Sequence, residues 1–396
     1  MAFAGIRISE RHQEDDTLLL MKTAVAVLSL LAMSRCLQAQ TGPPPIPAIA
    51  SVTPMGTVTQ DPVVQGRDGT YSAQMGDVSF WLFDDTALTV YNASNENFFS
   101  NSLSWTTNLD ATNGITLNGN YVDSSGYPTT FFPFLPWELA YNQQHAGSGT
   151  SCQVQPCGAE FAIWPGPLVP DPARNRALIL YGEIWRSPTY SGWVSIGEGI
   201  AVWQNGKITR PVMSPGTAYP TLMRQGSDVG FTSGWVVSGS TLYTYGNKGV
   251  FLAEDTQITR VPLASATTAS AWTYYAGNNT WNSNASSAVT VFNGGAAGSS
   301  VFYDDFLGMY VAIYSGVFNS NLYYNVSYTP WGPWSTATQF YTGLPGYQNN
   351  ADYAALAHPE FAQGNGQTQF VTYVEDTGFL AQDLQLLKVV FAPPSP

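Results

Sequence analysis

Short runs of apolar, aromatic and β-branched residues, broken by turn residues, recur along the chain from residue 77 to residue 374. No clear helical period interrupts them, so the pattern predicts an all-β fold made of many short strands. Two dipeptides, Asn205-Gly206 and Gly246-Asn247, are typical of hairpin turns. The segments predicted as strands are 77–83, 176–185, 199–203, 234–245, 249–254, 300–303, 309–315, 322–327 and 368–374.

Three stretches of the chain repeat one scheme of strands and turns. Residues 175–212 end in ITRPV, residues 232–263 end in ITRVPL, and residues 300–335 follow the same cadence. This weak repeat predicts a radial array of small antiparallel sheets, a β-propeller. The roughly 335 residues after the N-terminal segments allow about five to eight blades of about 40 to 70 residues. The long insertions favour a five-bladed β-propeller in a single domain, residues 63–396.

The composition agrees with an all-β protein and narrows its partners. Charged residues make up 10% of the chain and aromatic residues 14%, with 37 Gly and 26 Pro, which is typical of short strands joined by turns. The net charge of −13 argues against nucleic acid as a partner. The 22 Tyr and 12 Trp residues suit neutral sugars, which stack on aromatic faces. The sequence contains no serine-hydrolase elbow, P-loop or dinucleotide-binding fingerprint.

The N-terminal 62 residues are expected to lie outside the domain. Residues 1–39 form an N-terminal extension and a secretory signal peptide, MKTAVAVLSLLAMSRCLQAQ, and translation begins at Met1 or at Met21. The apolar run of the signal is too short to anchor the mature chain in a membrane. Residues 40–62 are predicted to be an extended, poorly packed proline-rich leader. The protein is therefore expected to be secreted and extracellular.

Secretion determines how the cysteines are interpreted. Cys36 leaves with the signal peptide, so Cys152 and Cys157 are expected to form a disulfide that staples one loop. Only His145 and His358 remain in the mature chain, too few for a three-histidine zinc site. No cofactor is expected, although a structural ion in the central channel is compatible with the sequence. The glycosylation sequons are Asn92, Asn278, Asn284 and Asn325.

The stretch from Gln65 to Leu88 carries the main candidate chemistry. A strand-like segment, 77–83, is apolar on both faces and lies between Asp68 and the pair Asp84-Asp85. This arrangement indicates a scaffold that delivers carboxyl groups to a rim. The alternative is that Asp68 and Asp85 are turn residues whose side chains bond their own backbone.

Several motifs in this stretch and beyond it resemble domain-of-unknown-function family 4185. They are Arg67-Asp68-Gly69, Trp81-Leu82-Phe83-Asp84-Asp85-Thr86, Asn101-Ser102-Leu103-Ser104-Trp105 and His358-Pro359-Glu360, and Trp331-Gly332-Pro333-Trp334-Ser335 looks like a blade ending of arabinan- and xylan-cleaving propellers. Members of this family act as endo-D-arabinanases, and the family is similar to the five-bladed propeller glycosidases. Two positions depart from its pattern: Thr70 and Asp84 stand where the family has glycine.

The resemblance implies a glycoside hydrolase, which needs two carboxyl groups that flank the scissile bond. Asp68 is expected to be the base or nucleophile, with Asp85 as its partner or as the group that tunes it. Glu183 is expected to be the acid, because its apolar neighbours would raise its pKa. The alternative for Glu183 is a structural ion pair with Arg186.

Other residues are expected to bind the sugar. Trp137 would stack on a ring while Glu138 bonds hydroxyl groups, unless their loop simply packs against its own domain. His358 would line the pocket, with Glu360 beside it, or His358 would cap a closing strand. The family motifs add Arg67, Asn101 and Trp105 as substrate contacts.

Together these features predict a secreted, monomeric glycoside hydrolase that cleaves a cell-wall polysaccharide, and the resemblance implies one with arabinofuranosyl units. A non-catalytic, lectin-like propeller that binds carbohydrate is the main alternative. A structural or host-interaction protein whose pocket has lost its chemistry is a second alternative.

Overall fold

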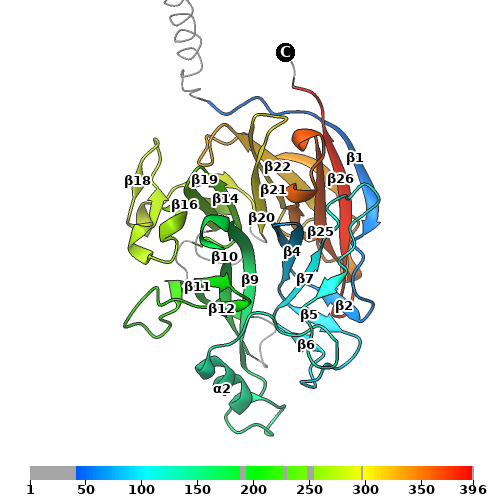
Figure 1. Ribbon diagram of the computed structural model, residues 1–396, viewed down its shortest axis with the longest axis vertical. Helices are drawn as coiled ribbons and strands as arrows, with labels where there is room; N and C mark the ends of the chain where they lie inside the picture. The colour runs from blue at the N-terminus through cyan, green and yellow to red at the C-terminus, as the bar shows by residue number, and fades with distance from the viewer. Residues whose placement is uncertain (1–41, 188–192, 227–229, 248–253, 296–297, 395–396) are drawn as a thin grey trace, which may run out of the picture. The chain divides into compact units, whose positions relative to one another are not determined.

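A computed structural model of the protein describes residues 42–187, 193–226, 230–247, 254–295 and 298–394. Residues 44–396 form one unit, and its described part consists almost entirely of antiparallel strands (Figure 1). The all-β prediction is therefore confirmed. The predicted signal peptide and Cys36 lie outside the described residues, as does most of the strand predicted at 249–254.

Five sheets follow one another along the chain. The first contains β3 (Tyr71–Met75), β4 (Val78–Phe83), β7 (Ser102–Thr106) and β8 (Gly119–Asn120). The second contains β9 (Glu160–Asp171), β10 (Arg176–Arg186), β11 (Trp193–Gln204), β12 (Lys207–Thr209) and β13 (Leu222–Gln225). The third contains β14 (Gly234–Ser238), β15 (Thr241–Asn247), β16 (Asp255–Pro262), β17 (Thr273–Tyr275), β18 (Trp281–Asn282) and β19 (Thr290–Asn293).

The last two sheets contain the strands from β20 to β26 and the N-terminal strand β1. The fourth contains β20 (Ser299–Asp304), β21 (Met309–Ser315), β22 (Asn321–Ser327) and β23 (Thr338–Thr342). The fifth contains β24 (Tyr353–Ala357), β25 (Thr368–Gly378), β26 (Ala381–Phe391) and, from the other end of the chain, β1 (Ile49–Thr57). A small extra sheet is formed by β2 (Val64–Arg67), β5 (Thr86–Leu88) and β6 (Phe98–Phe99).

The apolar core lies between neighbouring sheets. The first strands of the sheets contact one another in the order β3, β9, β14, β20 and β24, which is a propeller-like arrangement. Buried side chains from adjacent sheets share clusters: Leu82 and Ile179 belong to one cluster, and Leu178 and Leu242 belong to another. Burying an aliphatic side chain of this size stabilises the fold by about 1.5–3 kcal/mol. The polar ends of the first strands are thereby held close to one another.

Part of the proline-rich leader is extended, as predicted, but it is paired in a sheet rather than poorly packed. Residues 49–57 form β1, which pairs with β26 along its length, and the two strands lie side by side in Figure 1 (blue and red). The prolines do not prevent this, because β1 is an edge strand of its sheet and needs hydrogen-bond donors on one side only. The N-terminal strand therefore completes the C-terminal sheet.

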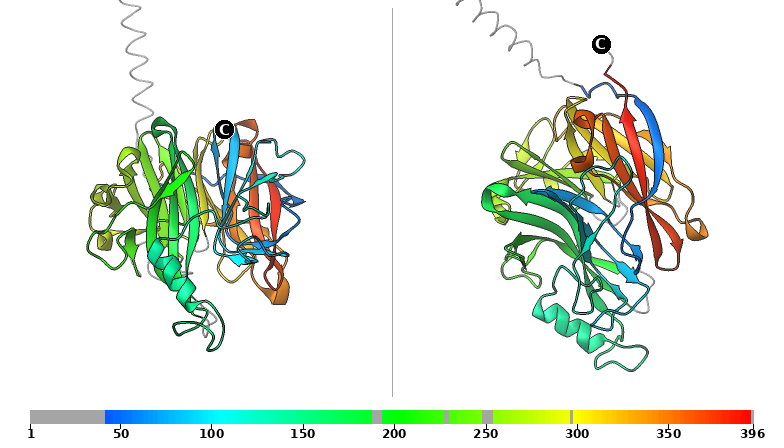
Figure 2. Two further views of the ribbon diagram at one scale, coloured as in Figure 1. Left: turned by 60° about the horizontal axis from the view of Figure 1, so that its bottom comes forward. Right: turned by 45° about the vertical axis from the view of Figure 1, so that its right-hand side comes forward.

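A helix, α2 (Pro136–His145), was also missed, because FPFLPWELAY was interpreted as an aromatic loop. Pro136 stands in the first turn, where its missing N–H costs nothing, and the Glu138 carboxylate accepts a bond of 2.7 Å from the Leu135 backbone N–H. The helix projects next to the start of β9 (Figure 2). No helix among the described residues is long and apolar enough to span a membrane.

The turn predictions were half right. Asn205-Gly206 connects β11 to β12 with positive φ at both residues, as a two-residue hairpin turn requires. Gly246-Asn247 instead ends β15 and pairs with β16, so it is not a turn. Cys152 and Cys157 form the predicted disulfide.

The four sequons differ in accessibility. Asn278 and Asn284 are exposed, whereas Asn92 and Asn325 are buried. The Asn325 amide donates to the Ser335 carbonyl and accepts from Tyr314, so this fold leaves no room for a glycan there. The glycosylation prediction is therefore retained at Asn278 and Asn284 only.

Candidate active site

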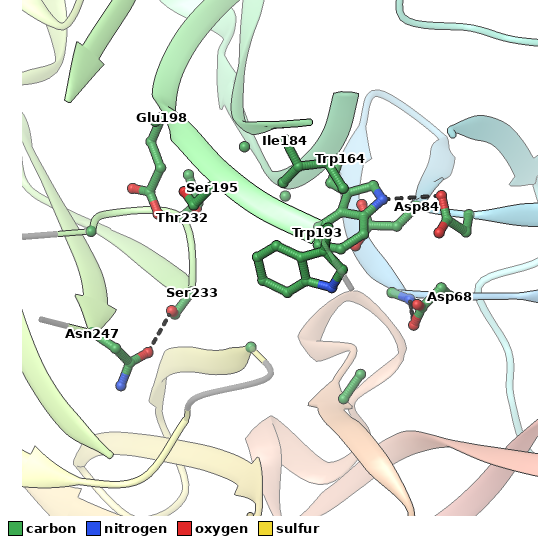
Figure 3. Close-up of a pocket in the computed structure, with 18 of the residues that line it drawn as sticks. Asp68, Asp84, Trp164, Ile184, Trp193, Ser195, Glu198, Thr232, Ser233 and Asn247 are labelled. Atoms are coloured by element: carbon green, nitrogen blue, oxygen red, sulfur yellow. Dashed lines mark hydrogen bonds between the residues drawn. The ribbon is translucent and has the colours of Figure 1, made fainter. Parts of the chain in front are cut away.

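One cavity of about 370 Å³ lies where the first three sheets and β24 meet. Four carboxyl side chains line it, and aromatic and glycine residues complete much of the wall (Figure 3). The carboxyl groups belong to Asp68, Asp84, Asp85 and Glu198, and the aromatic residues are Tyr71, Trp164, Trp193 and Tyr353. Two of the predicted catalytic residues, Asp68 and Asp85, are thus brought together, whereas Glu183 is absent from this lining.

Backbone hydrogen bonds hold Asp68 beside the end of β4. The Asp68 N–H donates to the Asp85 carbonyl at 2.8 Å, and the Asp84 N–H donates to the Asp68 carbonyl at 2.7 Å. The Asp68 carboxylate accepts bonds from the Gly69 N–H and the Tyr353 hydroxyl. Burial, together with the charge of Asp85, raises the pKa of Asp68 to about 6. Asp68 can therefore gain and lose a proton near neutral pH.

Asp85 has a different environment on the same side of the cavity. Its carboxylate forms an ion pair with Arg186 and accepts a bond of 3.0 Å from the Trp164 indole N–H. Arg186 also contacts Glu160 at 3.1 Å. Burial raises the pKa of Asp85, and the adjacent guanidinium opposes that effect. Because it has a fixed cationic partner, Asp85 is suited to orienting groups rather than exchanging protons.

Glu198 is the cavity residue that the sequence interpretation missed. It projects from β11 and lies on the opposite side from Asp68 in the view of Figure 3. Its carboxylate accepts bonds from the Phe231 N–H at 2.5 Å and the Thr232 hydroxyl at 2.8 Å. Burial raises its pKa, and these two bonds oppose the rise. Glu198 can consequently retain a proton at a higher pH than an exposed glutamate does.

Glycines on both sides of Glu198 were a usable signal in the sequence. A Cβ at residue 197 would lie 2.0 Å from the Arg224 carbonyl oxygen, and one at residue 199 would lie 2.3 Å from the Tyr181 ring. Close approach of a neighbouring backbone or ring is a common reason for glycine inside a strand. In β11, Gly197 and Gly199 lie on the crowded face of the strand, and Glu198 between them projects from the other face.

Glu183 lies in a separate buried cluster. Arg210 contacts the Glu183 and Glu138 carboxylates, each at 2.7 Å, and all three side chains are almost completely buried. Burial, then the charge of Glu138, raises the pKa of Glu183 to about 8. The residues before and after it, Gly182 and Ile184, line the cavity, whereas Glu183 does not. Strand alternation thus turns this side chain away from the cavity, toward α2.

The predicted ion pair of Glu183 with Arg186 is also absent, since Arg186 pairs with Asp85 and Glu160. The partner of Glu183, Arg210, follows the short strand β12 and is 27 residues away in sequence. Glu138 was expected to bond sugar hydroxyls, but it is fully buried with Arg210. Trp137 is 39% exposed and packs on Phe161, outside the cavity lining.

Three residues from the family motifs stabilise the fold and are not among the residues that line the cavity. Arg67 is fully buried, donates to Ser104 at 2.7 Å and lies over the Phe83 ring, and burial lowers its pKa to about 9. Asn101 bonds the backbone of Phe132 through both atoms of its amide. Trp105 packs on Phe80. Their predicted sugar contacts have no counterpart in the cavity lining.

His358 is buried in the last sheet. Its ring nitrogens bond the hydroxyls of Ser72 at 2.6 Å and Thr372 at 2.7 Å, and its ring stacks on Trp81. Burial lowers its pKa to about 3, so the imidazole is neutral. It does not line the cavity that contains Asp68. Glu360 accepts a bond from Ser79 and lines a second cavity of about 420 Å³.

The described residues contain no group of three or more His, Cys, Asp and Glu side chains placed to hold a metal ion. The cavity itself offers two kinds of carboxyl group. Burial raises the pKa values of Asp68 and Glu198, and Asp85 is fixed by Arg186. A proton acceptor and a proton donor on separate walls of a cavity are the groups that acid–base hydrolysis requires.

Comparisons with known proteins agree with the fold. The model of a domain of unknown function, DUF5005, matches residues 213–379. The resemblance to family 4185 therefore stays a prediction. No curated protein matches the chain.

Solved structures of similar fold include hydrolases. A presumed hydrolase from Bacteroides ovatus is 14% identical, with a TM-score of 0.54 over 84% of this chain and 86% of that chain. The catalytic domain of a family 62 α-L-arabinofuranosidase from Coprinopsis cinerea is 12% identical, with a TM-score of 0.43 over 86% of this chain and 100% of that chain. A family 117 glycoside hydrolase from Zobellia galactanivorans is 8% identical, with a TM-score of 0.48 over 86% of this chain and 90% of that chain. The Bacteroides ovatus protein shares the all-β fold described above.

Proposed function

We propose that this protein is a secreted glycoside hydrolase with a five-bladed β-propeller fold. The five successive sheets that begin with β3, β9, β14, β20 and β24 are the blades, and β1 closes the ring by pairing with β26. The observation that carries the function is the cavity, because carboxyl groups in different electrostatic environments line it together with Trp164 and Trp193. Indole faces suit sugar rings, and paired carboxyl groups suit the glycosidic bond.

Asp68 is the base or nucleophile in this proposal. Its pKa of about 6 leaves it ionised at neutral pH, and the Gly69 N–H and the Tyr353 hydroxyl orient its carboxylate. Asp85 forms an ion pair with Arg186 and accepts a hydrogen bond from Trp164. These contacts hold this part of the cavity wall in place. An ionised carboxylate held in one orientation can remove a proton from water or attack the sugar carbon.

Glu198 takes the role of the acid, in place of Glu183. Burial raises the pKa of Glu198 and favours its protonated form, and the hydroxyl of Thr232 and the N–H of Phe231 hold its carboxyl group in place. A protonated carboxyl group across the cavity from Asp68 can donate its proton to the departing oxygen of the glycosidic bond. Glu183 is committed to Arg210 and lacks access to the cavity.

The substrate is a neutral polysaccharide or oligosaccharide, and the resemblance to family 4185 implies one with arabinofuranosyl units. Trp164 and Trp193 in the cavity wall suit neutral sugars, which stack on aromatic faces. The protein would act as a monomer outside the cell.

Release of reducing sugar from a panel of neutral and acidic cell-wall polysaccharides tests this proposal. Asp68→Asn should lower kcat by about 10²- to 10⁴-fold, the range that one acid–base group contributes. In the wild type, kcat/KM should fall about tenfold per pH unit below about pH 6, because protonated Asp68 cannot act as a base. Asp383→Asn, at an exposed position, is the matched control and should behave as the wild type does.

Unchanged hydrolysis by Asp68→Asn would remove Asp68 from the mechanism. Binding of a glycan without any release of reducing sugar would instead favour the non-catalytic, lectin-like alternative. Isothermal titration calorimetry with the same polysaccharides separates these two results.

A further inference from the structure

Asp84 is a third acid on the Asp68 side of the cavity, and neither the family resemblance nor the proposed acid–base pair gives it a role. It stands directly after β4 and lines the same cavity as Asp68 and Asp85. The family pattern has glycine at this position, so Asp84 adds a carboxyl group to a site that already contains two on this side.

The carboxyl groups of Asp84 and Asp68 both lie close to Gly69. The Gly69 N–H donates to Asp68 Oδ1 at 3.0 Å. A Cβ at residue 69 would lie 2.9 Å from Asp84 Oδ2 and 3.1 Å from its Cγ. Since the Asp84 N–H also donates to the Asp68 carbonyl, the two residues cannot move apart without breaking a bond of 2.7 Å. Their separation is therefore determined by the backbone.

The charged groups around Asp84 are mostly negative. Asp68 and Asp85 act on it from its own side of the cavity, and Asp84 in turn acts on the Tyr71 hydroxyl of β3. Arg186 of β10 is the cation that faces it, but Arg186 forms its ion pairs with Asp85 and Glu160. Tyr353 of β24 bonds Asp68, and Asp376 of β25 adds further negative charge near Asp68.

The lack of a hydrogen-bond donor at one carboxyl oxygen also disfavours the ionised form of Asp84. Its Oδ1 atom is buried and has no hydrogen-bond partner among the described residues. A buried carboxylate without a cation or donors is costly, so such a group keeps its proton instead. Burial, then the charges of Asp68 and Asp85, raises the pKa of Asp84 well above its ordinary value. Asp68 ionises near pH 6, and its charge then helps to retain the proton on Asp84.

We propose that Asp84 is a positioning residue that stays protonated beside ionised Asp68, so that these two neighbouring carboxyl groups together carry a single negative charge. Carboxyl groups that share a site in this manner titrate in two separated steps, as like charges held close together do. The catalytic part of the inference rests on the proposed function: ionisation of Asp84 at high pH would place a second negative charge beside the base and disturb the bound sugar.

Titration of the full-length protein tests the proposal without any activity. With ¹³C label at the aspartate carboxyl carbons, NMR should show one aspartate that titrates near pH 6 and another, Asp84, whose pKa is raised well above that of an ordinary aspartate and that titrates after Asp68. Asp84→Asn should remove the Asp84 signal and leave the Asp68 signal within about half a pH unit. Asp77→Asn, at an exposed turn residue, is the matched control and should remove neither signal.

Stability supplies an independent measurement. Asparagine has the shape and neutrality of a protonated aspartic acid, so Asp84→Asn should fold and unfold at a temperature close to that of the wild type. Asp84→Gly, which restores the residue of the family pattern, should also fold and lack the high-pH signal. Failure of both variants to fold, absence of an aspartate that titrates at a higher pH than Asp68, or persistence of that signal in Asp84→Asn would overturn the proposal.

The pH profile of kcat/KM gives the functional test on the best polysaccharide substrate. The wild type should lose activity at alkaline pH, and Asp84→Asn should retain it there while keeping the acidic limb near pH 6. An alkaline limb that is identical in both proteins would overturn the positioning role. If no polysaccharide is hydrolysed, the proposed function fails, whereas the NMR titration still decides whether Asp84 holds its proton.

Discussion

Replacement of Arg210 by methionine tests whether the cluster of Glu138, Glu183 and Arg210 stabilises the fold rather than taking part in the chemistry. Methionine keeps much of the length and apolar contact of arginine but removes the cation that contacts both carboxyl groups at 2.7 Å. Breaking a buried ion pair by removing one partner costs about 3–5 kcal/mol, because it leaves an uncompensated buried charge. Arg210→Met should therefore be strongly destabilised at pH 7.

This cost can be expressed as a shift in the unfolding temperature. A unit of roughly 350 residues has an unfolding entropy of about 0.7 kcal/mol per kelvin, from about 2.1 cal/mol/K per residue. A loss of about 3–5 kcal/mol then lowers Tm by about 4–7 °C. Differential scanning calorimetry resolves such a shift. The matched control is Arg174→Met, whose side chain is 41% exposed and whose partner Asp171 keeps Arg176 at 2.8 Å, so it should change stability by less than about 1 kcal/mol.

The destabilisation of Arg210→Met should depend on pH in a definite direction. The pKa of Glu183 is already raised to about 8 by burial and Glu138, and loss of the guanidinium would raise it further. In the unfolded chain a glutamate ionises near pH 4.3. A carboxyl group with a raised folded-state pKa contributes stability below its unfolded pKa and loses it as the pH rises through the folded pKa. Below about pH 8 Glu183 keeps its proton in both proteins, so the stability difference between the variant and the wild type should grow as the pH rises above about 8, where only the wild type can ionise Glu183 beside Arg210.

Two further substitutions, combined with Arg210→Met in one variant, separate the electrostatic explanation from a packing defect. Adding Glu138→Gln and Glu183→Gln to Arg210→Met should recover part of the lost stability, since no buried charge then remains. A single variant, Arg210→Met, that unfolds at the wild-type temperature, or one whose loss of stability does not grow as the pH rises above about 8, would refute the electrostatic argument. Activity of the folded variants should stay at the wild-type level, because the cluster lies outside the cavity.

Two other predictions concern residues near the central strands. Gly69→Ala should lose about 1–3 kcal/mol in urea unfolding, because residue 69 has φ of +65° and its Cβ would lie 2.9 Å from Asp84 Oδ2; equal stability would show that the loop adjusts. His358 has a pKa lowered to about 3 by burial, so the stability it contributes is present above about pH 6.5 and is lost as the pH falls toward 3. His358→Gln should therefore weaken the pH dependence of unfolding between pH 6.5 and pH 4, and an unchanged dependence would contradict the neutral, buried imidazole.

Much of the fold could be predicted from local sequence. Period-two alternation and turn residues place β4, β10, β21 and β22 within a few residues, because a strand needs only its own side chains to alternate between faces. The β1 strand could not be recognised in this way, since its partner β26 is more than 300 residues away. The helix α2 was obscured by its aromatic residues and prolines, and its low amphipathicity gives no helical stripe.

In the candidate site, too, some residues could be predicted from local sequence and others only from the tertiary structure. Asp68 and Asp85 could be predicted, because both lie at the ends of one short, apolar segment and are brought together by a single hairpin. Glu183 and Glu198 are both strand acids among apolar residues, and nothing local tells which one faces the cavity. Only the pairing of β10 with β11 and the position of Arg210 decide it, because one residue of strand register reverses the face on which a side chain projects. Sequence thus identified Asp68 and Asp85, whereas only the tertiary structure excluded Glu183 from the cavity and placed Glu198 there.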